Sequence, residues 1–181
     1  PAHGFLSYAW EFLYCFLQTA RLSLVVAARR GFDVVHSANP PDTFWALAAV
    51  YKLFGRKYVF DHHDLCPELY LSRFGAGREG SLPHRVLRWL EWAQFRTADL
   101  VISTNESYRQ VAIERGGVPP ERVFVVRSGP SRERFATLRE PDASLRRGRR
   151  HLVAYLGVMA PQDGVDHLLR AARILADRGR D

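Results

Sequence analysis

The stretch from Lys57 to Tyr70 reads KYVFDHHDLCPELY, and it decides the fold that we predict for the chain. It begins with a short apolar run, Tyr58-Val59-Phe60, which is typical of a buried strand. The run ends in four ionisable side chains, Asp61-His62-His63-Asp64, with Glu68 close behind. Open α/β sheets bind their ligands beyond the carboxyl ends of their strands, so this loop is the first candidate for a functional site.

Strand and helix patterns alternate on both sides of this stretch. Short apolar runs predict strands at residues 32–36, 57–60, 99–103, 122–126 and 151–156. Helical periodicity or helix-start signals predict helices at residues 5–29, 39–54, 84–97, 105–115 and 164–178, and the second of these is expected to be capped by Asn39. This alternation predicts an α/β fold, a Rossmann-like parallel sheet with helices on both faces, followed by the first βα unit of a second lobe.

The composition changes near the end of the fourth strand. From Ser128 to Arg150 the composition shifts to Arg, Pro, Ser and Gly with few large apolar residues, which is typical of a linker. We therefore expect a Rossmann-like lobe at residues 1–130 that lacks its first strand, a linker at 131–150, and the start of a second lobe at 151–181. Residue 1 is a proline without an initiator methionine, and we expect the chain to be a fragment of a longer protein.

The net charge of +7 and the sequence pI of about 9.9 permit three kinds of anionic partner: nucleic acid, an anionic membrane surface or a phosphorylated substrate. The basic run at residues 146–150 has no interleaved aromatic residue and matches no binding motif, so we expect no nucleic-acid partner. Cys15 and Cys66 have neither metal-ligand nor redox spacing, which fits a reducing, cytoplasmic compartment.

The first helical segment, residues 5–28, is long and mostly apolar, but Glu11, Gln18 and Arg21 interrupt it. A charge in mid-bilayer costs about 2.5–3.5 kcal/mol on insertion scales, which disfavours a spanning helix. We expect an amphipathic helix buried or half-buried on the lobe, and an interfacial membrane helix is the alternative. Trp89 and Trp92 are expected to pack in the core.

Polar groups follow most of the predicted strands, and several of these loops lead into helix N-termini, whose free N–H groups suit phosphate. This convergence predicts a phosphate-bearing ligand. A metal site built from His62, His63 and Asp64 is not expected, because neighbouring residues of a strand point to opposite faces. For the same reason His62 is expected to be structural.

Five segments, FDVVHSANPPD, YVFDHHDLCPELY, ADLVISTNES, RVFVVRSG and VAYLGVMAPQDGVDHLLRAA, occur in this order. Together they resemble the retaining glycosyltransferases of family 4, which have the GT-B fold of two Rossmann-like lobes facing across a cleft. The resemblance covers most of the acceptor-side amino-terminal lobe, the linker and the start of the donor-binding lobe.

The resemblance implies a role for each matching position. His63 would contact the donor sugar near its reacting carbon, and Gly157 would let the backbone pass close to the donor diphosphate. Two strand-end asparagines are added to these as binding candidates. The candidate site residues are therefore His63 as the catalytic residue, Asn39, Asp64 and Glu68 in the acceptor pocket, and Gly157 and Asn105 at the donor.

The implied reaction moves a sugar from a nucleotide-diphosphate donor to a hydroxyl of a sugar or lipid-linked acceptor, with retention and without a cofactor or metal. It would serve cell-surface polysaccharide or glycolipid synthesis in the cytoplasm. The basic charge and the aromatic first helix permit peripheral contact with the anionic inner membrane face. The isolated 181 residues are expected to be inactive, because most of the donor lobe is missing.

Val158 and Asp163 depart from the family pattern, since many members have phosphate-clamping cations at these places. Two alternatives therefore stay open: a sugar-nucleotide epimerase of the same architecture, and a non-catalytic lobe that binds a partner. Purely structural roles for these residues also stay open. In that interpretation His63 hydrogen-bonds the backbone, and Asp64 and Glu68 cap the turn after the strand.

Overall fold

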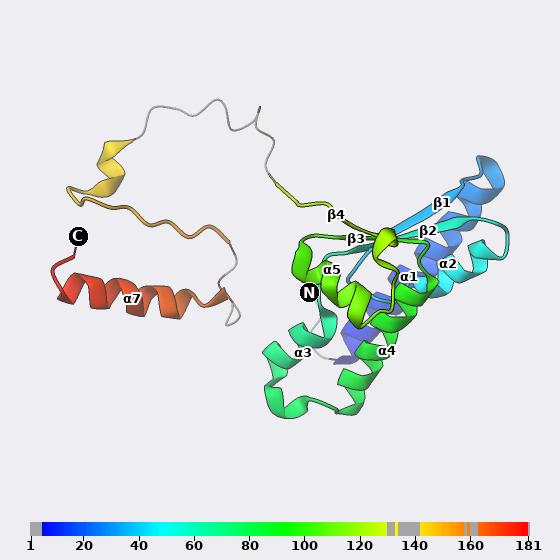
Figure 1. Ribbon diagram of the computed structural model, residues 1–181, viewed down its shortest axis with the longest axis horizontal. Coiled ribbons are helices and arrows are strands. Elements are labelled where there is room, and N and C mark those ends of the chain that lie inside the picture. Colours follow the sequence, from blue (N-terminus) through cyan, green and yellow to red (C-terminus); the bar gives the residue numbers. More distant parts are fainter. Residues whose placement is uncertain (1–4, 130–132, 134–141, 158, 160–162, 181) are drawn as a thin grey trace. The chain divides into compact units, whose positions relative to one another are not determined.

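The computed structural model describes residues 5–129, 133, 142–157, 159 and 163–180. The chain divides into two compact units, Pro1–Ser128 and Gly129–Asp181, and each is described by itself. Figure 1 shows the elements of both units.

The first unit is built on a four-stranded parallel sheet in the order β1-β2-β3-β4 (Figure 1). In the register, His36 of β1 lies opposite Val59 of β2, and Phe60 of β2 lies opposite Val101 of β3. All four carboxyl ends therefore gather at one edge of the sheet. The strands are β1 (Val34–Ala38), β2 (Lys57–His62), β3 (Leu100–Ser103) and β4 (Val123–Val125).

Helices connect these strands, as the alternating sequence pattern predicts. The α-helices are α1 (Phe5–Arg29), α2 (Trp45–Lys52), α3 (Cys66–Phe74), α4 (Leu82–Thr97) and α5 (Glu106–Glu114), and the short 3₁₀ helices are η1 (Ala76–Arg78) and η2 (Pro120–Arg122). The predicted α/β, Rossmann-like fold with a parallel sheet is confirmed.

The core lies between one face of the sheet and the helices. Tyr58, Phe60 and Val101 on that face are fully buried, and they pack with Phe95 of α4 and Ala112 of α5. The other face carries the alternate residues of the same strands and remains partly open to water. Val34 on β1 is 49% exposed there, and Phe124 on β4 is 50% exposed.

Two local predictions were wrong near the candidate site. α2 begins at Trp45, and its N-cap residue Phe44 makes no side-chain cap bond. Asn39 does not cap this helix, because its side chain bonds the loop after β2 instead. The loop after β2 also contains a helix that the sequence analysis missed, α3, which has a proline in its first turn and Glu68 beside it. Both features are ordinary helix-start signals.

α1 has the predicted bounds and is followed by Gly31 in the left-handed region, at φ +69°. One side of α1 packs on the α2 region, where the Tyr51 hydroxyl lies 2.8 Å from that of Ser23 and the rings of Phe16 and Phe44 stack. The opposite side faces water, and Trp10 is 65% exposed. The helix is therefore packed along one side only.

Trp89 and Trp92 on α4, which were expected to pack in the core, are exposed. So are several other apolar residues of the two helices, namely Phe12, Cys15, Leu22 and Val26 on α1 and Val86 on α4. The apolar positions of both helices run around most of the circumference, so periodicity could not identify the packed side. Within the described residues, one helix (Trp10–Arg29) is long and apolar enough to cross a membrane, and it is not buried.

The second unit contains a short 3₁₀ helix, η3 (Ala143–Arg146), and the predicted helix, α7 (Val165–Asp177). Residues 151–156 form no strand, because no neighbouring strand in the described part of this unit offers them hydrogen-bond partners. Leu168, Leu169 and Leu175 are correspondingly exposed on α7. Much of the predicted linker (131–132 and 134–141) and Val158 lie outside the described residues.

Candidate active site at the carboxyl end of β2

The side chains of Asp61 and His63 meet at the carboxyl end of β2. Nε2 of His63 lies 3.1 Å from Oδ1 of Asp61, and Nε2 of His36, on β1, lies 3.5 Å from the other carboxylate oxygen. The His63 and His36 side chains are both well exposed, whereas that of Asp61 is mostly covered. One carboxylate therefore stands between two accessible imidazoles at the edge where ligands bind in such sheets.

The contact with Asp61 determines which nitrogen of His63 is available. A neutral imidazole has one N–H donor and one acceptor nitrogen. If Nε2–H donates to Asp61, Nδ1 is left with a free lone pair that can accept a hydrogen bond from a ligand. Asp61 was not among the predicted site residues. The spacing of Asp61 and His63 could have indicated their contact, because residues two apart on a strand share a face.

Asn39 holds the loop that carries His63. Its Oδ1 accepts hydrogen bonds from the main-chain N–H groups of His63 (2.8 Å) and Asp64 (3.1 Å), and its Nδ2 donates to the carbonyl oxygen of Asp64 (2.7 Å). Asn39 is only 4% exposed. Its polar atoms are therefore largely occupied in fixing the loop after β2.

A buried polar cluster lies beside Asn39. The Asp42 side chain is buried, and this burial raises its pKa, which the neighbouring Cys66 thiol and Asn39 amide offset only in part. Burial also raises the pKa of the Cys66 thiol, and the carboxylate of Asp42 acts in the same direction. Both shifts favour the uncharged forms of these two buried groups.

Glu68 belongs to an ion cluster that joins three helices. Arg115, just after α5, pairs with Glu68 of α3 and with Glu91 of α4, whose Oε1 lies 2.5 Å from Nη2 of Arg115. Glu91 is 1% exposed, and burial raises its pKa to about 7 although Arg115 opposes the shift. The carboxylate of Glu68 is half exposed, and Arg115 lowers its pKa against the opposing effect of burial.

This cluster changes the interpretation of Glu68, whose carboxylate has a structural partner in addition to any ligand. No local sequence pattern indicates the pair of Arg115 and Glu91, because the two residues are 24 positions apart and belong to different segments.

His62 points to the opposite face, as expected. Its ring is fully buried and lies 5.0 to 5.6 Å from the rings of Phe60, Phe95 and Tyr108. Burial lowers the pKa of His62 to about 4, so the ring is neutral at physiological pH. No group of three His, Cys, Asp or Glu residues in the described part of the chain is arranged to hold a metal ion.

The two donor-side candidates lie in different units. Asn105 caps α5, where its Oδ1 accepts a hydrogen bond from the main-chain N–H of Tyr108 at 3.0 Å. Gly157 lies in the second unit, where a Cβ at its position would come within 3.1 Å of the Tyr155 hydroxyl. A side chain there would displace Tyr155.

No curated protein matches the chain. The family model described as Glycosyltransferase Family 4 matches residues 4–134. That range includes the whole sheet and the Asn39, Asp61 and His63 loops, and it covers more than half of the 181 residues. The chain therefore belongs to Glycosyltransferase Family 4.

Proposed function

We propose that this glycosyltransferase moves a sugar from a nucleotide-diphosphate donor to an acceptor hydroxyl with retention of configuration at the reacting carbon. The observation that carries the proposal is the pairing of His63 with Asp61 at the carboxyl end of β2, in a chain whose family transfers sugars. The pair is exposed enough to meet a ligand, and the Asn39 bonds hold its loop.

In the proposed reaction the bond between the sugar carbon and the donor diphosphate breaks, and a bond from the acceptor oxygen to the same face of that carbon forms. The acceptor proton passes to an oxygen of the leaving phosphate. The protein contributes by positioning both substrates and by stabilising the charges that develop. His63 accepts a hydrogen bond from a sugar hydroxyl through Nδ1 and supports the sugar as positive charge builds at its reacting carbon.

The remaining candidates divide between the two substrates. Asp64 and Glu68 contact the acceptor, a sugar or lipid-linked hydroxyl, and Asn39 holds the loop after β2. Asn105, at the start of α5, and Gly157 contact the donor phosphates. Helix N-termini favour anions, which supports this role for the α5 end. We propose that neither a cofactor nor a metal takes part.

We also propose a setting for the reaction. The net charge of +7 attracts anionic substrates and surfaces. We therefore place the protein in the cytoplasm, peripheral to the inner membrane face. The pathway would be the synthesis of a cell-surface polysaccharide or glycolipid.

The test is sugar transfer by the full-length protein and by His63→Ala, with a panel of nucleotide-diphosphate sugars and product configuration read by NMR. Removal of one preorganised contact to a transition state typically costs 10²–10³ in kcat, and we expect about 10² for His63→Ala. Undiminished transfer by His63→Ala would remove His63 from the mechanism.

Two further outcomes would overturn the wider proposal. Conversion of the donor without any acceptor would indicate an epimerase. Absence of nucleotide-diphosphate binding by the full-length protein would indicate a non-catalytic binding lobe. Inversion at the reacting carbon would leave sugar transfer standing but exclude retention.

A further inference from the structure

Tyr108 lies in the first turn of α5, with its ring against the end of β2. The centroid of the ring is 5.2 Å from that of His62. The main-chain N–H of Tyr108 donates to Oδ1 of Asn105 at 3.0 Å, so the turn that carries the ring is capped. Tyr108 is half-buried, and within the part of the chain that the structure describes its hydroxyl makes no hydrogen bond. The protein therefore holds the ring on one side and leaves its hydroxyl to a ligand.

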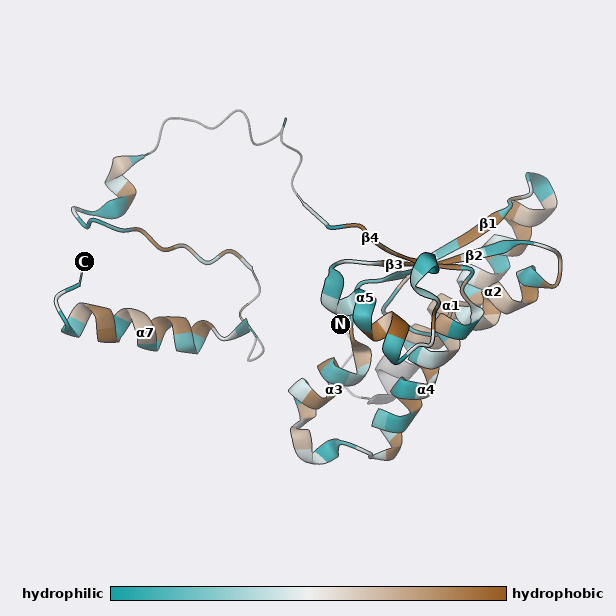
Figure 2. Ribbon diagram, viewed as in Figure 1, coloured by the Kyte–Doolittle hydropathy of each residue, from teal (hydrophilic) through white to brown (hydrophobic). Residues whose placement is uncertain are grey.

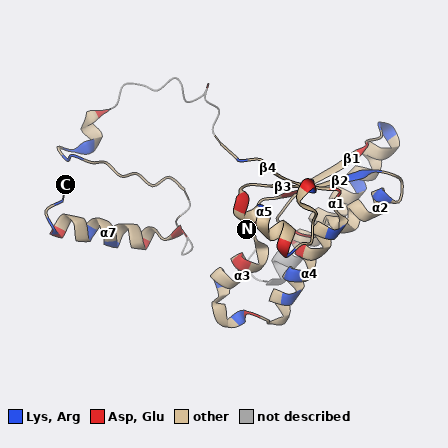
Figure 3. Cartoon of the chain, in the orientation of Figure 1, with Lys and Arg blue, Asp and Glu red and all other residues tan. Residues whose placement is uncertain are grey.

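Two carboxylates of the proposed acceptor pocket lie near the Tyr108 hydroxyl. The pKa of Tyr108 is raised, first by burial and then by the negative charges of Asp64 and Glu68. Such an effect weakens with distance, so it indicates proximity. Asp64 belongs to the loop after β2, Glu68 to α3 and Tyr108 to α5. Figure 3 shows acidic positions on α3 and α5, and Figure 2 shows polar and apolar segments on both helices.

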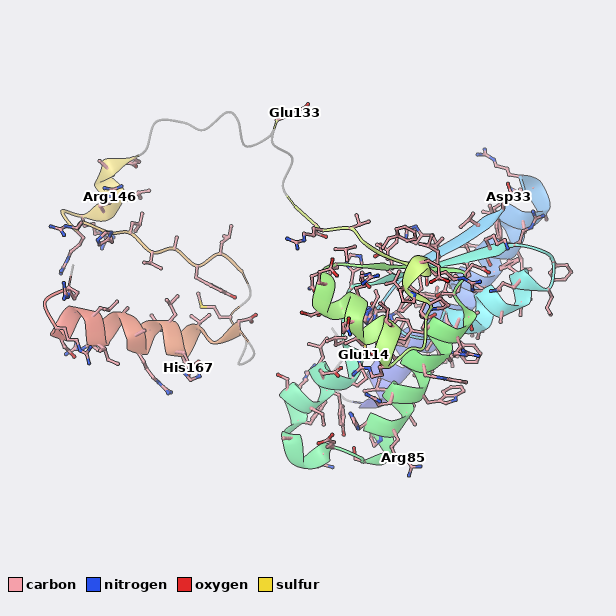
Figure 4. The ribbon with its side chains drawn as sticks, viewed as in Figure 1. Asp33, Arg85, Glu114, Glu133, Arg146 and His167 are labelled. Carbon is pink, nitrogen blue, oxygen red and sulfur yellow. The ribbon has the colours of Figure 1, made fainter. Side chains whose placement is uncertain are left out.

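Arg115 fixes the carboxylate of Glu68. Its two terminal nitrogens engage the two oxygens of Glu68, and Nη2 lies 3.3 Å from Oε2. Nη2 also contacts the buried Glu91, which anchors Arg115 in the core. In Figure 4 the labelled Glu114 marks the end of α5, one residue before Arg115. The Glu68 side chain is still 48% exposed, and a carboxylate has about four acceptor sites, so Glu68 can accept further hydrogen bonds.

These groups complement a neutral sugar ring. Binding sites for small molecules combine aromatic side chains with a few fixed polar groups. A pyranose has an apolar face of C–H groups, which fits the Tyr108 ring, and hydroxyl donors around its rim, which fit the carboxylates. An anionic ligand would meet the negative charges of Asp64 and Glu68, whose nearest cation, Arg115, is already engaged. A hydrocarbon chain would leave the carboxylates without hydrogen-bond donors.

We propose that Tyr108 is a further residue of the acceptor pocket and that its ring packs on the apolar face of a neutral acceptor sugar. Glu68 accepts a hydrogen bond from a hydroxyl of the same sugar. Arg115 does not touch the sugar; it is a positioning residue that acts through Glu68. This inference rests on the proposed function and narrows its acceptor to one that carries a neutral sugar ring.

The experiment measures sugar binding by the full-length protein without a donor, by saturation-transfer difference NMR. The probes are the methyl β-D-pyranosides of glucose, galactose and mannose, together with methyl β-D-glucuronide. We expect saturation of the ring protons of at least one neutral pyranoside. We expect weaker binding of the glucuronide than of the glucoside, because the two differ by one negative charge.

Tyr108→Ala should raise the dissociation constant of the bound pyranoside about fivefold, which is the size of an aromatic contact. Tyr108→Phe keeps the ring and should bind within about twofold of the wild type. Tyr70→Ala is the matched control, because Tyr70 is also half-buried and its ring lies 5.0 Å from that of Phe74. Tyr70 is two residues from Glu68 on α3 and faces another side, so we expect a change of less than about twofold.

A double-mutant comparison tests the positioning role of Arg115. Glu68→Gln should raise the dissociation constant about tenfold, because hydrogen bonds to a charged acceptor are the stronger ones. Arg115→Lys keeps the charge but loses the two-pronged contact, and we expect about a threefold rise. In the Glu68→Gln background Arg115→Lys should have no further effect on binding. A merely structural Arg115 would weaken binding equally in both backgrounds.

Four results would contradict the inference. The first is that none of the neutral pyranosides binds, and the second is that Tyr108→Ala weakens binding no more than Tyr70→Ala. The third is tighter binding of the glucuronide than of the glucoside. The fourth is loss of binding in His63→Ala with none in Tyr108→Ala, which would place the ring on the donor side. Circular dichroism verifies that each variant is folded. Because no donor is present, a failure of sugar binding is separate from a failure of sugar transfer.

Discussion

Oδ1 of Asn39 accepts a hydrogen bond from the main-chain N–H of His63 at 2.8 Å. Asn39 follows β1 and His63 follows β2, so one buried side chain ties two adjacent strand-end loops together. The backbone from which the His63 side chain projects is therefore fixed from the neighbouring strand.

Asn39→Ala should loosen this loop. It leaves the N–H groups of His63 and Asp64 without their acceptor, which costs about 1–3 kcal/mol of unfolding free energy, measured by urea denaturation. We expect kcat for sugar transfer to fall about 10²-fold, because small misplacements of a catalytic group have effects of that size.

Gly116→Ala is the control for Asn39→Ala. Its added Cβ would lie 2.6 Å from the Phe95 ring, so it destabilises the core without touching the loop. A fall in kcat for Gly116→Ala as large as that for Asn39→Ala would show that global stability, and not the loop, controls the rate.

Asp61→Asn should impair the orientation of His63. The amide can present either its oxygen or its NH₂ group to Nε2 of His63, so the preference for one tautomer is weakened. We expect kcat to fall at least tenfold with little change in stability, since these side chains are partly exposed.

His36→Ala tests whether the effect belongs to His63. His36 contacts the other oxygen of Asp61 at 3.5 Å, and we expect its removal to change kcat less than threefold. If His36→Ala lowers kcat more than Asp61→Asn does, the imidazole that Asp61 orients for sugar transfer is that of His36 and not that of His63.

Arg115→Met should destabilise the first unit by about 1–3 kcal/mol at pH 7, because it leaves the buried Glu91 without its partner and Glu91, whose pKa is already raised to about 7, then takes up a proton. Arg115→Met/Glu91→Leu should regain most of this loss, since the second change removes the buried acid. Urea denaturation measures both. Glu68→Gln, at the half-exposed partner, should cost less than about 1 kcal/mol. If Glu68→Gln lowers the unfolding free energy as much as Arg115→Met does, the buried Glu91 is not the more important partner of Arg115.

His62 should make stability depend on pH. Its pKa is lowered by burial to about 4 in the folded state, below the ordinary value of 6.5. The unfolded chain therefore binds more protons between these values, and stability is lost as the pH falls from 6.5 toward 4. At 1.36 kcal/mol per pKa unit, the loss at pH 4 is about 3 kcal/mol.

Glu91 acts in the opposite direction, because its pKa is raised to about 7 and its contribution to stability falls as the pH rises from 4.5. The measurement is therefore the difference in unfolding free energy between the wild type and His62→Phe, at pH 7 and at pH 4. We expect this difference to change by about 3 kcal/mol in favour of His62→Phe at pH 4. An unchanged difference would mean that His62 is protonated alike in both states.

The sequence predicted the parallel sheet because the runs around Tyr58 and Val101 are apolar, short and separated by helical segments. It predicted the opposite orientations of His62 and His63 from strand alternation alone. It missed α3, although a proline and an acid stand in its first turn, because the glycines that follow suggested a loop.

The features of the fold and site that could not be predicted depend on contacts between residues distant in the sequence. The Asn39 bonds to the β2 loop and the Arg115–Glu91 pair join segments about 25 residues apart, which no local spacing encodes. The exposure of Trp89 and Trp92 could not be predicted either, because apolar residues occupy most sides of α4, and only packing determines which side is covered.

The partly open face of the sheet has a calorimetric consequence. Val34 and Phe124 already meet water in the folded first unit, so unfolding hydrates less new apolar surface than it would in a sheet covered on both faces. Apolar hydration is the source of the positive heat-capacity change. The heat-capacity change of unfolding should therefore be smaller than the usual value of roughly 12–15 cal/mol/K per residue. As a result, the free energy of unfolding should vary only gently with temperature.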